Sequence, residues 1–119
     1  MDIEYFRTYC LGKKGVTETF PFDEHTLVFK VMGKMFALAG LERVPSQCNL
    51  KCDPERAIAL REEYDGVIIP GYHMSKTHWN TLYMESLPPG LITELVDHSY
   101  DLVVSTLPKK IKAQWEGMP

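Results

Sequence analysis

The chain has 119 residues, of which 45% are hydrophobic and 24% are charged. These fractions match those of folded domains, so they exclude a disordered or fibrous chain and predict a single domain, 1–119, with its own core. The formal net charge of −3 argues against strong non-specific affinity for a phosphate backbone and leaves room only for a local basic patch, because that affinity comes from Lys and Arg displacing counterions.

The first half of the chain predicts one helix and three strands. A helix is expected over about 3–12, where apolar residues recur at helical spacing. Residues 26–32 and 35–41 are rich in strand formers. Gly33-Lys34 stands between them, which predicts a hairpin with a type II′ turn. A third strand is expected over about 47–52.

The second half predicts two helices and two strands. The segment "DPERAIALREEYDG" is the strongest helix signal, with Asp53 as N-cap. The stripe expected to face the core comprises Ala57, Ile58, Leu60, Arg61 and Tyr64. Strands are expected at 67–73 and 78–84, and a final helix at about 91–107 whose wide apolar face packs on the sheet. Residues from about 108 to 119 form a basic tail.

The resulting order, α-β-β-β-α-β-β-α, indicates the fold class. Three strands joined by short turns form an antiparallel sheet and not a doubly wound parallel one. We therefore expect an α+β protein, a two-layer sandwich of the form α-β(3)-α-β(2)-α, in which the helices pack on one face of the sheet.

The cysteines and the N-terminus point to the cytoplasm. Cys48 and Cys52 lie four residues apart in a predicted strand, hence about 13 Å apart, whereas a disulfide requires Cα atoms within about 7 Å. With Cys10 on the apolar side of the first helix, we expect three reduced, buried thiols. The start "MDIEYFRTYC" lacks the regions of a signal peptide, and no apolar run is long enough to span a membrane. We expect a cytoplasmic protein with no membrane partner.

The segment "HMSKTHWN" gathers unusual side chains between the last two predicted strands. His73 and His78 could face each other about 5 Å apart across the hairpin end, which would begin a zinc or nickel site. Such a site needs three or four protein ligands, and no further ligand can be placed from the sequence. The alternative is a histidine pair bonded to neighbouring backbone, and we expect no metal.

Catalysis receives little support from the sequence. There is no nucleotide-binding glycine motif, no Walker motif and no nucleophile elbow. We therefore expect a protein that is not an enzyme and that uses no cofactor, with a metal-dependent enzyme as the less favoured alternative.

The same segment also offers the chemistry of nucleic-acid binding. Lysine can contact phosphate, asparagine can pair with adenine, and tryptophan can stack on a base. The candidate DNA contacts are Lys76, His78, Trp79 and Asn80 in this segment, Lys34 at the other hairpin turn, and Lys109, Lys110 and Lys112 in the tail. The alternative is that Trp79 packs into the core beside the last helix and that the polar residues only form a soluble turn.

A resemblance to a known family covers nearly the whole chain. The segment "PGYHMSKTHWNTLYM" resembles the signature of the MmcQ/YjbR family, small bacterial proteins described as DNA-binding. Ser75 and Thr77 replace the Asn and Lys that are usual there. The segments "TETFPFDEHTLVFKVMGKMFAL", "LKCDPERAIALREEYDGVIIPGYHM" and "LVDHSYDLVVSTLPKK" are similar to other parts of the family. The resemblance implies an α-β(3)-α-β(2)-α fold, likened to type III secretion chaperones and to bacterial frataxin (CyaY).

Two functions follow as expectations. The first is a DNA-binding protein, monomeric or weakly dimeric. The second is a module that binds a protein or a small molecule on the sheet face or in a groove between sheet and helices. A contiguous basic patch around Lys34, Lys76 and the tail lysines would favour DNA. An apolar pocket on the sheet would favour the second function.

Overall fold

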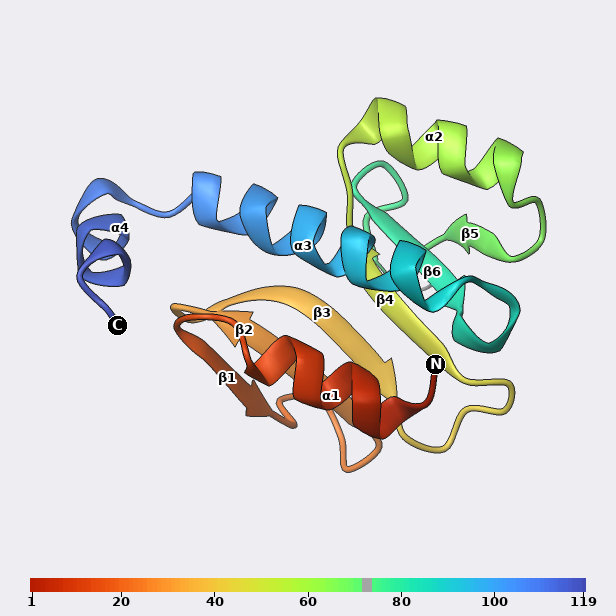
Figure 1. Cartoon of the computed structure of the whole chain (residues 1–119), viewed down its shortest axis with the longest axis horizontal. Helices are drawn as coiled ribbons and strands as arrows, with labels where there is room; N and C mark the ends of the chain where they lie inside the picture. Colours follow the sequence, from red (N-terminus) through yellow and green to blue (C-terminus); the bar gives the residue numbers. More distant parts are fainter. Residues whose placement is uncertain (72–73) are drawn as a thin grey trace.

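A computed structural model describes residues 1–71 and 74–119 of the chain. The elements are, in order, α1 (Ile3–Leu11), β1 (Val16–Thr19), β2 (Thr26–Val31), β3 (Lys34–Gly40), β4 (Gln47–Lys51), α2 (Pro54–Glu63), β5 (Ile68–Pro70), β6 (Trp79–Tyr83), a short 3-10 turn (Met84–Ser86), α3 (Pro89–Ser105) and α4 (Lys109–Glu116), as Figure 1 shows.

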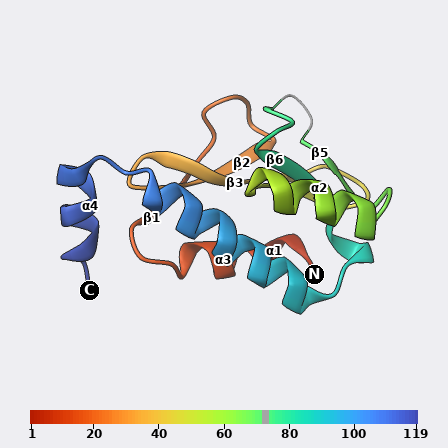
Figure 2. The same ribbon diagram turned by 90° about the horizontal axis from the view of Figure 1, so that it is seen from above.

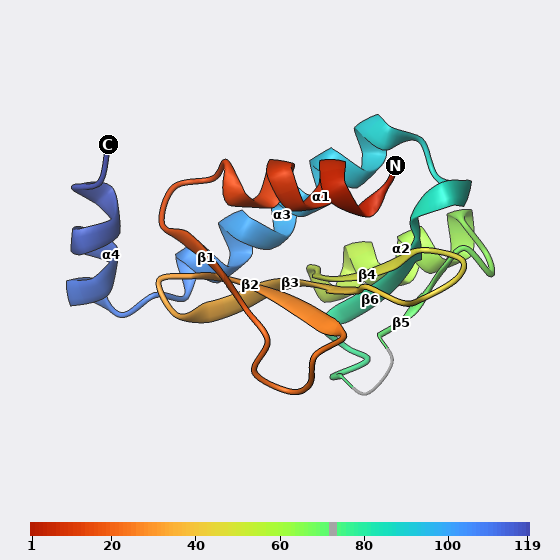
Figure 3. The same cartoon turned by 90° about the horizontal axis from the view of Figure 1, so that it is seen from below.

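The strands form one sheet in the order β1-β2-β3-β4-β6-β5, and every neighbouring pair is antiparallel. Helices α1, α2 and α3 lie on the same face, with α2 near the β5–β6 end of the sheet (Figures 2 and 3). The opposite face, here called the open face, carries no helix among the described residues (Figure 3). The predicted two-layer α+β arrangement with an antiparallel sheet is thus confirmed.

Local sequence signals account for where the helices begin. The carboxylate of Asp2 accepts a hydrogen bond from the Tyr5 amide at 2.8 Å, which caps α1. Asp53 caps α2 in the same way through the Arg56 amide, as expected. Helix α3 is the central one: its buried residues are Ile92, Leu95, Val96, Ser99, Tyr100, Val103 and Val104, and they meet the apolar residues of β2, β3 and β4.

Alternation along the strands divides the apolar residues between two clusters. The large cluster lies between sheet and helices and includes Phe6, Phe29 and Phe36. A small cluster of Val28, Leu38 and Trp79 lies on the other side of the sheet. Because side chains alternate along a strand, neighbours such as Val28 and Phe29 belong to different clusters. The open face is therefore apolar in its centre.

Two local predictions are wrong, and one strand was not predicted. Strand β1, where no strand was predicted, pairs with β2 at the edge of the sheet. The β2–β3 turn consists of Met32 and Gly33, not Gly33 and Lys34, and both have positive φ angles, as in a type I′ turn. Ile58 is 54% exposed instead of facing the core, because α2 buries only Ala57 and Leu60.

The predicted basic tail is folded. Residues Lys109–Glu116 form α4, which begins after Pro108 and lies beyond the end of α3 (Figure 1). None of its residues is buried, although Ile111 and Trp115 pack against the main cluster. Pro108 starts this helix without a side-chain cap. The tail is therefore an ordered surface element that carries three lysines.

The structure also shows the state of the three cysteines and the character of the helices. Cys10, Cys48 and Cys52 are all buried and free. Among the residues described, no helix combines the length and the apolar character that a membrane crossing requires.

Candidate binding surfaces

The segment between β5 and β6 forms a tip loop, residues 74–78, on the open face of the sheet (Figure 3). Lys76 and His78 are exposed there. The loop closes with a turn in which the amide of Trp79 donates to the Ser75 carbonyl at 2.9 Å. His73, the proposed partner of His78 in a metal site, lies outside the described residues. The tip thus offers Lys76 and His78 to a ligand.

Trp79 and Asn80 do not offer their side chains as expected. Trp79 is 8% exposed and packs on the open face against Val28 and Leu38, not beside the last helix. Asn80 is 2% exposed and points to the opposite side, where its amide donates to the Ala57 carbonyl of α2 at 3.4 Å. Burial of both residues follows from strand alternation at the start of β6. In this conformation neither can contact a base.

Arg61 of α2 holds the tip loop in place. Its Nε donates to Oδ1 of Asn80 at 2.7 Å, and its Nη2 donates to the Lys76 carbonyl. A third, longer contact joins Nη2 to the Trp79 carbonyl at 3.5 Å. A guanidinium presents several donors in a fixed plane, so one side chain connects the helix, the first strand residue and the loop. The position of Lys76 therefore depends on Arg61.

Three segments that carry lysines lie at one end of the molecule, here called the basic end (Figures 1 and 3). It comprises Lys13 and Lys14 after α1, Lys34 after the β2–β3 turn, and Lys109, Lys110 and Lys112 on α4. The Nζ of Lys34 lies 3.3 Å from the carbonyl oxygen of Thr106 at the end of α3. The Nζ of Lys14 lies 4.1 Å from the ring centroid of Trp115 on α4. These contacts join Lys14 to α4 and Lys34 to the end of α3, just before α4 begins.

A small polar network fixes the basic end. The indole Nε1 of Trp115 donates to the Tyr100 hydroxyl at 2.9 Å, and that hydroxyl donates to the Lys14 carbonyl. Asp97 of α3 pairs with Lys13 at 2.5 Å and accepts a hydrogen bond from Tyr9 at 2.7 Å. Burial, together with this carboxylate, raises the pKa of Tyr9 to about 12. Lys13 is thus partly neutralised, whereas Lys34, Lys109 and Lys110 remain exposed.

The structure does not join the tip loop to the basic end. Lys76 lies in the loop that projects from the open face, whereas α4 and the β2–β3 turn lie at one end of the long axis (Figures 1 and 3). The patch expected around Lys34, Lys76 and the tail lysines is therefore two separate surfaces. Lys13 and Lys14, which were not among the predicted site residues, belong to the larger one.

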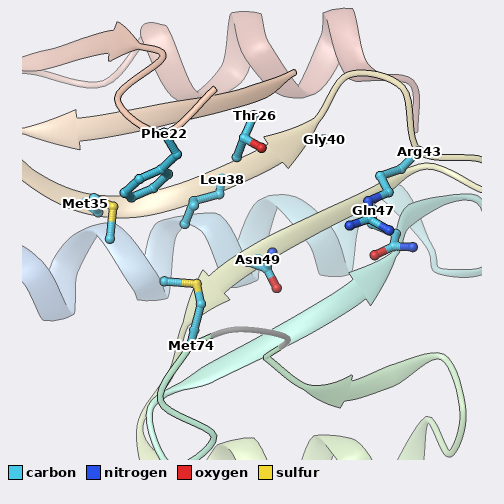
Figure 4. Close-up of a pocket in the computed structure, with 9 residues that line it drawn as sticks. All are labelled: Phe22, Thr26, Met35, Leu38, Gly40, Arg43, Gln47, Asn49 and Met74. Carbon is cyan, nitrogen blue, oxygen red and sulfur yellow. The ribbon is translucent and has the colours of Figure 1, made fainter. Parts of the chain in front are cut away.

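The open face also holds a pocket of about 410 Å³, shown in Figure 4. Its lining residues are Phe22, Thr26, Met35, Leu38, Gly40, Arg43, Gln47, Asn49 and Met74. Phe22 comes from the β1–β2 loop and Met74 from the tip loop, so two loops form walls above the sheet. None of these residues was predicted as a site residue. The alternation of Gln47 and Asn49 with buried Cys48 and Leu50 is the signal that places them on the exposed side.

The described residues show no cluster of three or more His, Cys, Asp or Glu side chains that could hold a metal. The cysteines are poor nucleophiles, because burial raises the pKa of Cys10 to about 12 and raises the pKa values of Cys48 and Cys52 as well. The side chains that these surfaces present are mainly lysines, amides and apolar groups.

Comparisons with known proteins identify the family. The YjbR family model matches residues 11–102. The uncharacterized protein YjbR of Escherichia coli strain K12 is 34% identical over 111 residues, which are 92% of this chain and 93% of that protein. The uncharacterized protein YbdF of Escherichia coli O157:H7 is 38% identical over 76% of this chain and 74% of its own.

Solved structures agree with this match. The crystal structure of the Deinococcus radiodurans protein DR2400, which carries a DUF419 domain, is similar with a TM-score of 0.90 and 37% identity over 98% of this chain and 88% of that chain. A Pseudomonas syringae protein is similar with a TM-score of 0.73 and 27% identity over 86% of this chain and 98% of that chain. Since the family model and a nearly full-length relative agree, the chain belongs to the YjbR family.

Proposed function

We propose that this protein binds double-stranded DNA, without catalysing a reaction, through its basic end. The observation that carries the proposal is the convergence of lysines from three segments that are distant in the sequence: Lys13-Lys14, Lys34 and the α4 lysines. The formal net charge of −3 makes such a concentration of positive charge notable. Clustered lysines that contact successive phosphates release condensed counterions, which is the main source of non-specific DNA affinity.

The burial of the three cysteine thiols supports the part of the proposal that the protein does not catalyse a reaction. A nucleophilic cysteine needs an accessible thiolate, and burial favours the neutral thiol at all three positions. The exposed cations at the basic end are suited to contacts with phosphate oxygens, which position a duplex without reading its sequence. We therefore expect binding with little sequence preference.

The test is the salt dependence of binding to a short duplex, measured by fluorescence anisotropy. Each lost lysine–phosphate contact lowers the slope of log K against log salt by about 0.9. Replacement of Lys109, Lys110 and Lys112 by Gln should therefore lower the slope by up to about 2.7. These side chains lie on a helix with no buried residue, so the fold should be retained.

A charge-matched control separates this surface from net charge alone. Replacement of Arg43, Lys51 and Arg56 by Gln removes three charges elsewhere and should change the slope much less. Lys76→Gln tests the tip loop by itself. The proposal fails if no duplex binds at low salt, or if both triple variants lose affinity equally.

A second candidate function is the binding of a small molecule on the open face. The specific observation is the pocket between Phe22 and Met74, whose volume of about 410 Å³ falls in the range of about 300–1,000 Å³ typical of ligand sites. Leu38, a member of the apolar cluster on the open face, forms its floor. DNA binding at the basic end and ligand binding here use different residues, so each can be tested without the other.

A further inference from the structure

The open-face pocket is polar at one end because of Arg43. Its side chain lies across Gly40: a Cβ at position 40 would be 2.5 Å from Cγ of Arg43. The glycine therefore allows the aliphatic stem to pack on β3 while the guanidinium turns towards Gln47 (Figure 4). Within the described parts of the chain, no acidic residue pairs with Arg43. Among the described residues that line the pocket, Arg43 is also the one that carries a full charge.

Two amides extend this polar end along β4. Gln47 and Asn49 are two residues apart on the same strand, so both side chains face the pocket. The Asn49 oxygen accepts a hydrogen bond from the Thr81 hydroxyl. With that oxygen occupied, the Asn49 amide nitrogen is the group left to donate to a ligand. Arg43, Gln47 and Asn49 thus present a row of donors.

The other end of the pocket is apolar and adaptable. Phe22 is 64% exposed on its loop, and Met35 and Met74 are partly buried beside Leu38 (Figure 4). Methionine side chains are flexible and make favourable contacts between sulfur and aromatic rings. An exposed phenylalanine above two methionines is a surface on which a flat ring can be held. The pocket is therefore amphipathic along its length.

We infer that this pocket binds a small aromatic carboxylate, with the carboxylate at Arg43 and the ring between Phe22, Met35 and Met74. A guanidinium and a carboxylate form paired, charge-assisted hydrogen bonds. Gln47 and Asn49 donate to the same group, and Leu38 forms the floor. The inference rests on the second candidate function and is independent of DNA binding at the basic end.

The probes that test it are naphthalene-1-acetate and its neutral isostere naphthalene-1-acetamide, titrated into ¹⁵N-labelled protein. We expect the backbone amides of Met35, Leu38, Gln47 and Asn49 to shift with the acid. The acid should bind about tenfold or more tightly than the amide, since a hydrogen bond to a charged group is stronger than one between neutral groups. Arg43→Gln should abolish this preference.

Two further variants test the ring contact and provide a control. Phe22→Ala, in an exposed loop, should weaken the acid and the amide by the same factor. Arg56→Gln, on α2, should leave the preference unchanged. If acid and amide bind equally well at the open face, the ligand class is wrong while a small-molecule site stands. If neither probe shifts these amides at millimolar concentration, both the inference and the second candidate function are overturned.

Discussion

Replacement of Arg61 by Met should loosen the tip loop and destabilise the protein. The methionine keeps an apolar stem but removes the donor that satisfies Oδ1 of Asn80, whose residue is 2% exposed. A buried polar group that loses its partner costs about 1–3 kcal/mol, whereas the exposed Lys76 carbonyl can bond to water instead. We expect a loss of about 2 kcal/mol in the free energy of unfolding, or about 8 °C in Tm for a domain of this size.

The matched control is Arg56→Met on the same helix. Arg56 pairs with Glu94 at 2.5 Å, but both side chains are substantially exposed, so this pair contributes at most about 1 kcal/mol. Urea unfolding measures both losses, and hydrogen exchange at the Trp79 amide, which is bonded to Ser75, reports the loop. If Arg61→Met costs no more than Arg56→Met, or if this amide exchanges at the same rate in both, Arg61 does not anchor the loop.

Three further predictions concern the helices and the thiols. Ser99→Ala should lower the free energy of unfolding, measured in urea, by about 3 kcal/mol. The buried Ser99 hydroxyl donates to the Phe36 carbonyl and accepts from the Lys51 amide, and both groups lose this partner. Ser105→Ala, on the exposed side of α3, should change the free energy of unfolding little. Burial, with Arg56 nearby, lowers the pKa of His98, whose Nε2 accepts from the Asp53 amide. The unfolded state therefore binds the proton more readily, so the contribution of His98 is complete above about pH 6.5 and is lost as pH falls below it. His98→Gln should flatten the profile of stability against pH in that window, and an unchanged profile would contradict this assignment. A thiol reagent at mildly alkaline pH should label the three cysteines only after the protein unfolds, because burial raises their pKa values. Rapid labelling of the native protein would contradict the burial.

The parts of the fold that follow from local chemistry could be predicted from the sequence. Asp53 followed by Pro54 fixes the start of α2, and the apolar stripe of α3 fixes the face that meets the sheet. Strand β1 was missed because "VTET" is short and mostly polar, and its pairing with β2 supplies what its own sequence does not. The position of the β2–β3 turn depended on Met32 adopting a positive φ, which few residues with a side chain do.

The candidate sites were harder to predict because they form through contacts between distant segments. Asn80 belongs to a polar stretch of sequence that is typical of a surface. It nevertheless lies on the same face of β6 as Leu82, beneath α2, where Arg61 donates a hydrogen bond to its side-chain oxygen. Lys14 contacts the last helix through the ring of Trp115. The open-face pocket combines loops that are separated by four strands and a helix. No local pattern encodes such neighbours.

The most direct test of the central claim is a map of amide chemical-shift changes when ¹⁵N-labelled protein is titrated with a short DNA duplex at low salt. DNA binding at the basic end predicts that the largest changes occur at Lys14, Lys34 and the α4 lysines, and that added salt reverses them. Changes confined to Lys76 and His78, or the absence of any salt-sensitive change, would contradict it.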